Sequence, residues 1–225
     1  MQKPSKVMSL FITVLIPIAI LLLSSNLVLR LPLTYSFYFN DSQSLNEINY
    51  NVKVSYMGKA IAKYFSVPSS NKFQAYEKNG KYEDGVFKDK EQKAMEKAKS
   101  FLSRQLFIGL AALLLAVLIY ANTTRRGMRD ILRHESWIAM GLTGLLLLLQ
   151  IILISSKSFR RLLYCKFIGI KLSHNATLYT IMGGGNIYTS YLLIATITGL
   201  IFLLLFAYVN HRYTKPDRIF YNRRF

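Results

Sequence analysis

Four long apolar runs constrain the fold of this chain more than any other feature of its sequence. They cover residues 7–29, 106–121, 137–156 and 188–209. A helix needs about 20 apolar residues to cross the hydrocarbon core of a bilayer; three runs reach that length alone, and 106–121 reaches it with its flanks. The sequence therefore predicts an integral membrane protein with four transmembrane helices.

The first run could also be mistaken for a signal peptide, since Lys3 and Lys6 precede it. It is longer than the apolar region of a signal peptide, and no Ala-x-Ala-like cleavage sequence follows before Arg30. We expect it to be retained as the first transmembrane helix.

The stretch from Asp89 to Asn122 is expected to form one unbroken helix. It begins as a charged sequence and becomes wholly apolar with no proline or glycine pair between. Asp89 is the expected N-cap, and Gln92 stands where a capping box needs it. At about 1.5 Å per residue this helix would be roughly 50 Å long, so it would couple a segment outside the membrane to one inside it.

Basic residues in the short connections predict the orientation. The 123–136 connection and the 210–225 tail are rich in arginine, which the positive-inside rule places in the cytoplasm together with the N-terminus. The expected location is the plasma membrane, multi-pass, with both termini cytoplasmic. The net charge of +18 lies in the loops and at the ends of the apolar runs, so anionic phospholipid rather than nucleic acid is the expected partner.

The fold class expected is an all-α membrane protein, a four-helix bundle with a small α+β cap outside the membrane between helices 1 and 2. The cap's first residues, LPLTYSFYF, are aromatic and β-branched enough to indicate an extended segment after Pro32. Residues 51–65 have apolar side chains at helical spacing, and KFQAYEKNGKYEDGVF is typical of a hairpin turned at Asn79-Gly80.

The second outer segment alternates basic with aromatic or aliphatic residues, as a segment in the membrane interface does. The expected organisation is then transmembrane helices over 7–30, 104–122, 137–156 and 188–209, the cap over 31–103, a cytoplasmic basic loop over 123–136, an outer interfacial loop over 157–187 and a cytoplasmic basic tail over 210–225.

Several kinds of chemistry are disfavoured by what the sequence contains. The interiors of the apolar runs have no Asp, Glu, Lys, Arg or His, which argues against a transporter because coupled transport relies on ionisable groups inside the membrane. Cys165 is the only cysteine, so no internal disulfide or thiolate metal cluster can form. No nucleotide-binding, zinc-protease or serine-hydrolase motif occurs, and we expect neither a metal site nor a cofactor.

His174 is the histidine best placed for a catalytic role, because it falls in the outer segment 157–187. As a general base it would need a partner, and Glu83 or Asp84 on the expected hairpin could serve if the fold brings them together. The alternative is a surface histidine in a polar turn.

Arg160, Arg161 and Lys166 follow the third apolar run on its outer side. They could bind the phosphate of a lipid headgroup, for which arginine offers bidentate geometry. They could equally be interfacial anchors whose charged ends reach for water. The sequence leaves both interpretations open.

The layout as a whole resembles that of the bacterial lipoprotein intramolecular transacylases. The stretches LRLPLTYSFYFN after the first run and FKDKEQKAMEKAKSFL before the second are also similar. The resemblance implies a membrane enzyme of Gram-positive type that moves an acyl chain from the diacylglyceryl group of a lipoprotein onto its N-terminal amine. It also implies two outer-face histidines as the catalytic groups.

The chain departs from that family at both histidines. The family's Glu-x-x-His-Met-x-Asp-Val-Lys stretch corresponds to residues 91–99 here, where Ala94 replaces the histidine and Lys97 the acid. At the second position this chain has residues 164–167, YCKF, and His174 lies further along. An alanine cannot move a proton, so either other groups catalyse the reaction or the scaffold is kept without it.

The sequence favours a membrane protein that handles a lipid or lipoprotein substrate at the outer leaflet. If it is an enzyme, acyl transfer is the expected reaction, with His174 as base, Glu83 or Asp84 orienting it, and Arg160, Arg161 and Lys166 holding the headgroup. The alternative is a non-catalytic accessory protein that docks another membrane protein through its apolar outer surfaces.

Overall fold

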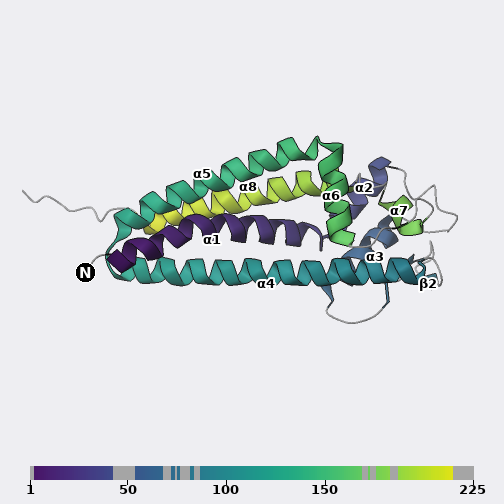
Figure 1. Ribbon diagram of the computed structural model, residues 1–225, viewed down its shortest axis with the longest axis horizontal. Coiled ribbons are helices and arrows are strands. Elements are labelled where there is room, and N and C mark those ends of the chain that lie inside the picture. The colour runs from purple at the N-terminus through teal and green to yellow at the C-terminus, as the bar shows by residue number, and fades with distance from the viewer. Residues whose placement is uncertain are drawn as a thin grey trace, which may run out of the picture.

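Four long helices form the body of the molecule in the computed structural model (Figure 1). The structure describes residues 3–42, 54–67, 72–73, 75–76, 82–83, 87–168, 172, 176–182 and 187–214. Within these residues, the helices long and apolar enough to cross a membrane are α1 (Lys3–Val28), α4 (Asp89–Arg125), α5 (Arg129–Ile154) and α8 (Ile187–Tyr213). The prediction of a multi-pass membrane protein with four such helices is confirmed.

Helix α1 packs against all three of the other long helices. The face of α4 that meets it is lined by small residues, among them Gly109, Ala112 and Ala116, all buried. A Cβ added at Gly109 would lie 3.0 Å from Leu23 Cδ2, so glycine permits the close approach of α1 and α4. Small residues at the contact are the usual means by which membrane helices approach each other.

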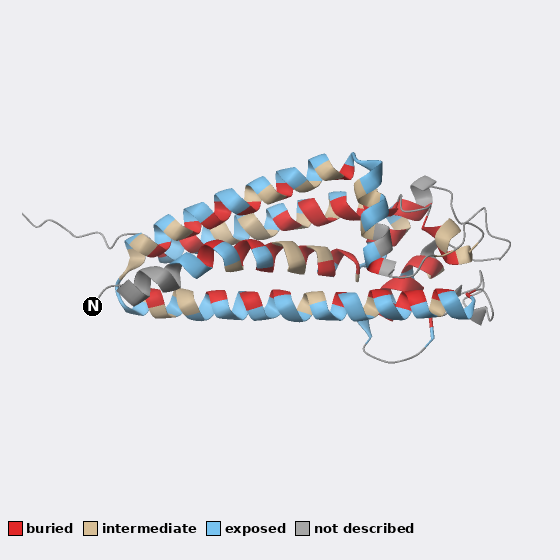
Figure 2. Ribbon diagram, in the orientation of Figure 1, coloured by how far each residue is buried: buried red, intermediate tan, exposed pale blue. Residues whose placement is uncertain are grey.

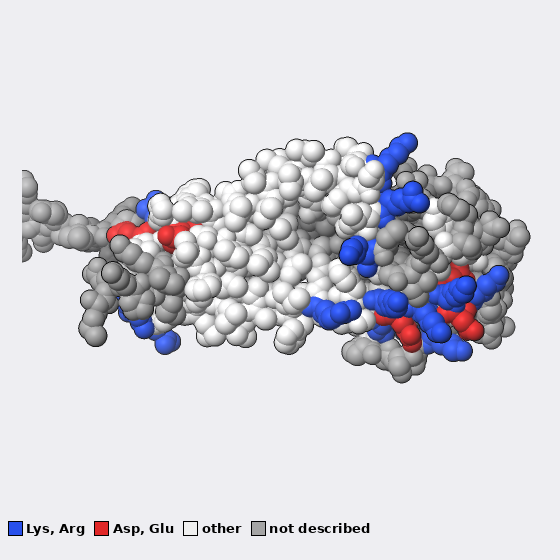
Figure 3. Space-filling model, in the orientation of Figure 1, with Lys and Arg blue, Asp and Glu red and all other residues white. Residues whose placement is uncertain are grey.

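The surface of the bundle is apolar along its length. Phe107, Ile152 and Leu204 are each about 70% exposed, at 74%, 69% and 69%. Figure 3 shows charged side chains at the two ends of the face it draws and none along the middle section. An exposed apolar band between charged ends is what a lipid environment requires of a protein surface.

The segment between α1 and α4 is mainly helical where it is described. It contains α2 (Pro32–Ser42), α3 (Val54–Ser66) and the two-residue strands β1 (Ala75–Tyr76) and β2 (Tyr82–Glu83), which pair antiparallel. The expected turn at 79–80 lies outside the described residues. So small a strand pair does not support the expectation of an α+β cap.

Pro32 begins helix α2, and the expectation of an extended segment there is wrong. Proline suits the first position of a helix, since its missing N–H would have no intrahelical partner there. Thr34, Tyr35, Tyr38 and Phe39 are buried, and residues four apart share one face of a helix. Burial of that aromatic face against the molecule outweighs the β propensity of the individual residues.

The first residues of α2 also donate hydrogen bonds to carbonyl groups at the end of α1. Thr34 Oγ1 donates to the Val28 carbonyl at 2.8 Å, and the Tyr35 hydroxyl donates to the Leu29 carbonyl at 2.6 Å. The last carbonyls of a helix have no intrahelical donor, and buried ones need another partner. These bonds tie the first turn of α2 to the end of α1.

Helix α4 is unbroken over 37 residues, as expected, but its cap differs from the prediction. Lys88 rather than Asp89 holds the N-cap position, with extended backbone (φ −73°, ψ 163°). Its N–H donates to Glu91 Oε2 at 2.7 Å, so Glu91 rather than Gln92 makes the return bond of the capping box.

The connections after α4 contain more helix than expected. Only residues 126–128 interrupt the helical chain between α4 and α5, and Gly127 has the positive φ (+72°) that such a tight reversal uses. The segment expected as an outer loop contains α6 (Lys157–Ile168) and α7 (Thr177–Ile181). Figure 1 shows α6 lying across the end of the bundle, and Figure 2 shows buried residues gathered there.

Candidate functional site

Polar groups and aromatic rings of the described residues gather where α2, α3, α6 and α7 meet the bundle. Phe167 of α6 occupies its centre. Its ring centroid lies 6.1 Å from that of Phe65, 6.0 Å from that of Phe101 and 6.0 Å from that of Tyr188. Four elements, α3, α4, α6 and α8, therefore meet around one side chain.

This junction is closed. The cavity among Leu29, Tyr35, Phe65, Phe167 and their neighbours has a volume of about 20 Å³. One water molecule needs roughly 10–15 Å³ of such volume. The cavity therefore has room for about one water molecule and not for a ligand of the size of an acyl chain.

Glu91 is buried, with 2% of its surface exposed, and both of its carboxylate oxygens accept backbone hydrogen bonds. Oε2 accepts from Lys88 N at 2.7 Å, and Oε1 accepts from Leu178 N, 87 positions further along, also at 2.7 Å. The carboxylate thus joins the start of α4 to the first turn of α7. Its role in this structure is to connect α4 to α7.

Gln92 makes a second such link, to Phe73. Its Oε1 accepts from Phe73 N at 2.8 Å, and its Nε2 donates to Phe73 O at 2.7 Å. The Phe73 ring is buried against Phe87, with the centroids 4.6 Å apart. Successive polar side chains at the start of α4 therefore position two separate parts of the outer segment.

Ala94 lies in the packed core on the next turn of α4. It is fully buried, as are Met95 and Ala98. This is the position at which the resemblance would place a catalytic histidine. In this chain the position offers no group that can move a proton and no open space in front of one.

A cationic cluster, consisting of Asn26, Arg30, Lys99 and Tyr64, lies at the end of the α1–α4 contact nearest α2. Arg30 Nε donates to Asn26 Oδ1 at 2.8 Å, and Asn26 Nδ2 donates to the Leu102 carbonyl at 2.7 Å. Lys99 Nζ lies 4.5 Å from the centroid of the Tyr64 ring. Burial, together with the positive charge of Arg30, lowers the pKa of Lys99. Two cationic side chains thus lie at the same end of the bundle.

The Arg30 side chain is partly buried. Burial lowers the pKa of its guanidinium from the ordinary value, yet arginine stays charged in proteins. The described residues provide no acidic partner for it, and only its Nε is used in a hydrogen bond to them. The remaining guanidinium N–H groups can therefore serve an anion or an ester oxygen from outside the chain.

A further polar contact continues from this cluster into the bundle. Gln105 Nε2 donates to Ser25 Oγ at 2.8 Å, and Ser25 Oγ donates to the Leu21 carbonyl at 2.7 Å. Gln105 Oε1 is buried and has no hydrogen-bond partner among the described residues. The end of the α1–α4 contact nearest Arg30 therefore includes polar side chains from both helices.

The three basic residues expected to hold a headgroup are all on α6. Arg160 Nη1 donates to Thr189 Oγ1 at 2.8 Å, which joins α6 to α8. Arg161 and Lys166 are exposed.

The inward face of α6 is made of Phe159, Leu163 and Phe167. At 100° per residue Arg160 and Lys166 flank this face on opposite sides and Arg161 lies on the far side, so the three do not form one clamp.

The proposed base and its partners are only partly described. His174 and Asp84 lie outside the described residues, and of Glu83 only the backbone is described, in β2 opposite Ala75. Their pairing stays a prediction. The part of the chain that the structure describes contains no group of three or more His, Cys, Asp or Glu able to hold a metal ion.

Sequence reasoning missed Arg30 and Lys99 as candidate binding residues. Arg30 carried a usable signal, because it stands four residues after Asn26, on the same helix face, at the end of an apolar run. Lys99 carried none, since many lysines in that region are alike and only the fold brings this one to Arg30.

No protein-family model and no curated protein matches the chain. Solved structures that resemble it include two of the membrane integral lipoprotein intramolecular transacylase Lit from Bacillus cereus, determined in meso with single histidine replacements. The first has a TM-score of 0.69 and 13% identity and covers 93% of both chains. The second has a TM-score of 0.68 and 13% identity over 93% of this chain and 91% of the other. The chain therefore shares the fold of this lipoprotein transacylase.

Proposed function

We propose that this protein binds a lipid or lipoprotein at the outer leaflet, with the cationic cluster contacting the phosphate or ester oxygens of its headgroup. The observation that carries the proposal is Arg30, a partly buried guanidinium held by Asn26 and without an acidic partner among the described residues. Arg30 is only partly buried, so its remaining N–H groups can reach an oxygen of a ligand at the membrane surface. At a membrane surface the headgroup region supplies the missing oxygens.

The orientation follows from the two ends of the bundle. The tight turn at 126–128 joins helices whose adjoining ends carry Arg125, Arg126, Arg129 and Arg133. Arginines in a short connection favour the cytoplasmic side. Arg30, at the opposite end of the bundle, then belongs to the outer interface, together with α2, α3, α6 and α7.

Helix α6 fits a role at the same interface. It has an apolar inward face, with Arg160 and Lys166 at the two margins of that face and Arg161 on the side away from the protein. Amphipathic helices of this kind lie in the plane of the headgroups. Arg160 is the headgroup ligand best fixed in place, since its bond to Thr189 holds it on α8.

The reaction suggested by the shared fold is an acyl transfer within a lipoprotein. The N-terminal amine attacks the carbonyl carbon of a glyceryl ester, an amide bond forms as the ester bond breaks, and the glyceryl oxygen takes up a proton. A base must accept the proton that the amine loses. His174 is the proposed base, with Glu83 or Asp84 orienting it, because Ala94 cannot act and both carboxylate oxygens of the buried Glu91 already accept backbone hydrogen bonds.

Lipid binding is tested by substituting Arg30. The full chain is purified in detergent and its binding of phosphatidylglycerol is titrated by native mass spectrometry. Hydrogen bonds to a charged group contribute about 1.5–3 kcal/mol, so Arg30→Gln should weaken the outer binding event by about tenfold or more. The control is Arg104→Gln, an exposed arginine further along α4. Equal binding by the Arg30→Gln variant and the control would contradict the proposal.

Catalysis is tested with a synthetic diacylglyceryl-cysteine peptide in the same detergent. Acyl transfer leaves the mass unchanged, so the readout is the fragmentation spectrum that places the acyl chain on the amine. The wild-type protein should give this product and His174→Ala should not. No product from the wild-type protein would refute the catalytic part and leave the binding part to the Arg30 experiment.

One observation favours the alternative of a non-catalytic accessory protein. The turns of α4 that would present the family's acid–base groups instead hold Ala94 in the core and Glu91 in a backbone-binding role. A second membrane protein purified in stoichiometric amount, together with no effect of His174→Ala on the lipoproteins of the host, would support it.

A further inference from the structure

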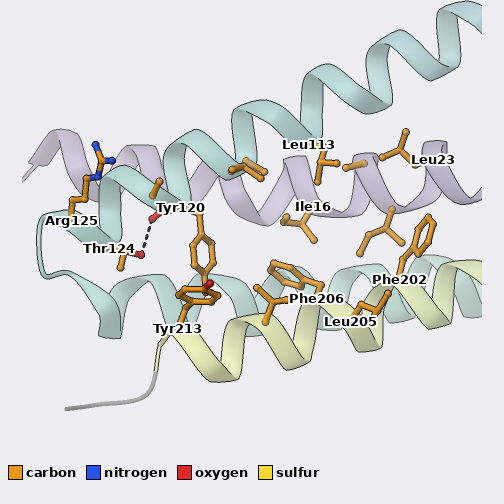
Figure 4. Close-up of a pocket in the computed structure, with 16 residues that line it drawn as sticks. Ile16, Leu23, Leu113, Tyr120, Thr124, Arg125, Phe202, Leu205, Phe206 and Tyr213 are labelled. Carbon is orange, nitrogen blue, oxygen red and sulfur yellow. Dashed lines mark hydrogen bonds between the residues drawn. The ribbon is translucent and has the colours of Figure 1, made fainter.

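A groove opens between α4 and α8 in the half of the bundle away from α2 and α3. Its volume is about 760 Å³. Leu113 and Val117 of α4 form one wall, Leu205 and Phe206 of α8 form the other, and Ile16 of α1 lies at its floor. Figure 4 shows Leu113 on one side of this space and Leu205 and Phe206 on the other.

The end of the groove nearest the basic turn is polar. The Tyr120 hydroxyl donates to Asn210 Oδ1 at 2.8 Å and so joins α4 to α8 there. Thr124, Arg125 and Tyr213 line this end (Figure 4). The groove thus has an apolar body inside the span and one positive charge at its mouth. Among the described residues Arg125 has no acidic partner.

We propose that this groove binds one acyl chain of an anionic phospholipid, with the phosphate at Arg125. An apolar groove inside a membrane is not filled by water, since its walls offer no polar partners. A flexible acyl chain fits the volume, and an anionic headgroup fits the charge at the mouth.

This site is separate from the cationic cluster and lies in the other leaflet. Arg125 is roughly 40 Å from Lys99 along α4, at about 1.5 Å per residue. That separation matches the thickness of a bilayer with its headgroups. The molecule therefore has one cationic headgroup site at each interface, and the proposal does not depend on catalysis at the outer one.

The test uses two matched pairs of variants of the full chain. Ala121→Trp fills the groove, whereas Ala111→Trp places the same ring on an exposed part of the same helix outside it. Arg125→Gln removes the charge at the mouth, and Arg126→Gln removes its exposed neighbour. Each protein is incorporated into nanodiscs of equal parts phosphatidylglycerol and phosphatidylcholine and extracted with mild detergent. The phospholipids retained per chain are counted by native mass spectrometry.

We expect Ala121→Trp to retain one phospholipid fewer than Ala111→Trp. Arg125→Gln should lose about fivefold in its preference for phosphatidylglycerol over phosphatidylcholine, and Arg126→Gln should keep that preference. Arg30→Gln should still retain the lipid of this groove, which separates the two sites. Equal retention by the two tryptophan variants would overturn the proposal. So would a change of oligomeric state in Ala121→Trp without lipid loss, because the occupant would then be a second copy of the chain.

Discussion

The bridge made by Glu91 predicts a local effect that can be measured at one amide. Glu91 Oε1 accepts from Leu178 N at 2.7 Å, and this bond joins α7 to α4 across the core. Both groups are buried, so water does not replace the carboxylate when it is removed. A hydrogen bond to a charged group contributes about 1.5–3 kcal/mol, which corresponds to about 10- to 150-fold in a local opening equilibrium.

Hydrogen exchange followed by mass spectrometry measures that equilibrium on the full chain in detergent. In Glu91→Ala we expect the amide of Leu178 to exchange about 10- to 150-fold faster than in the wild-type protein. Glu91→Gln should also accelerate it, because the amide supplies one acceptor oxygen in place of two and its NH₂ would face a backbone donor. Glu96→Ala, on the exposed face of the same helix, is the matched control.

The result that refutes this reasoning is equally specific. If Leu178 exchanges at the wild-type rate in Glu91→Ala while α5 and α8 keep their protection, Glu91 does not hold α7. The buried carboxylate would then be available for chemistry, and the exclusion of this turn of α4 from the reaction would fail with it.

Three further predictions concern the junction and the bundle. Phe167→Ala removes the ring around which four elements meet and should lower the free energy of unfolding by about 3–5 kcal/mol. The loss is measured as a lower thermal midpoint in detergent. Phe107→Ala, at an exposed site, should leave the midpoint unchanged. Gly109→Leu should lower the thermal midpoint by an amount equivalent to about 1–3 kcal/mol. Gly141→Leu should not lower it, since a Cβ at Gly141 meets nothing within 4 Å. Equal midpoints for the two variants would contradict the close α1–α4 contact. Burial raises the pKa of Tyr35 well above 10, so its contribution to stability is present below pH 10 and is lost as the pH rises toward the folded pKa. The thermal unfolding midpoint should therefore fall less steeply above pH 10 in Tyr35→Phe than in the wild-type protein. Parallel curves for the two proteins would show that ionisation of Tyr35 does not cause the loss of stability at high pH.

The four spans and the unbroken α4 follow from sequence alone. In a bilayer no water can satisfy the backbone, so an apolar run of sufficient length must form a helix whose hydrogen bonds are internal. That constraint is local, and it holds whatever the neighbouring helices do. The same reasoning identified α4 correctly, since its 37 residues contain good helix formers and no breaker.

Tertiary packing determined the secondary structure of the segment between α1 and α4. The residues after Pro32 have β propensity, but their aromatic face is buried as a helix, and Thr34 and Tyr35 donate hydrogen bonds to the carbonyls of Val28 and Leu29. Propensity is a weak preference, and burial of several aromatic side chains outweighs it. No local pattern in the sequence reports which surface that face will meet.

For the candidate sites, too, some residues could be identified from the sequence and others only from the tertiary structure. The basic residues of α6 and the arginines near the 126–128 turn were visible as charges beside apolar runs, because membrane interfaces select charge locally. The bond between Glu91 and Leu178 and the approach of Lys99 to Arg30 join residues far apart in the chain. The groove between α4 and α8 exists because both helices pack on α1. Such contacts depend on how helices are placed in three dimensions, and the spacing of residues along one chain does not contain that placement.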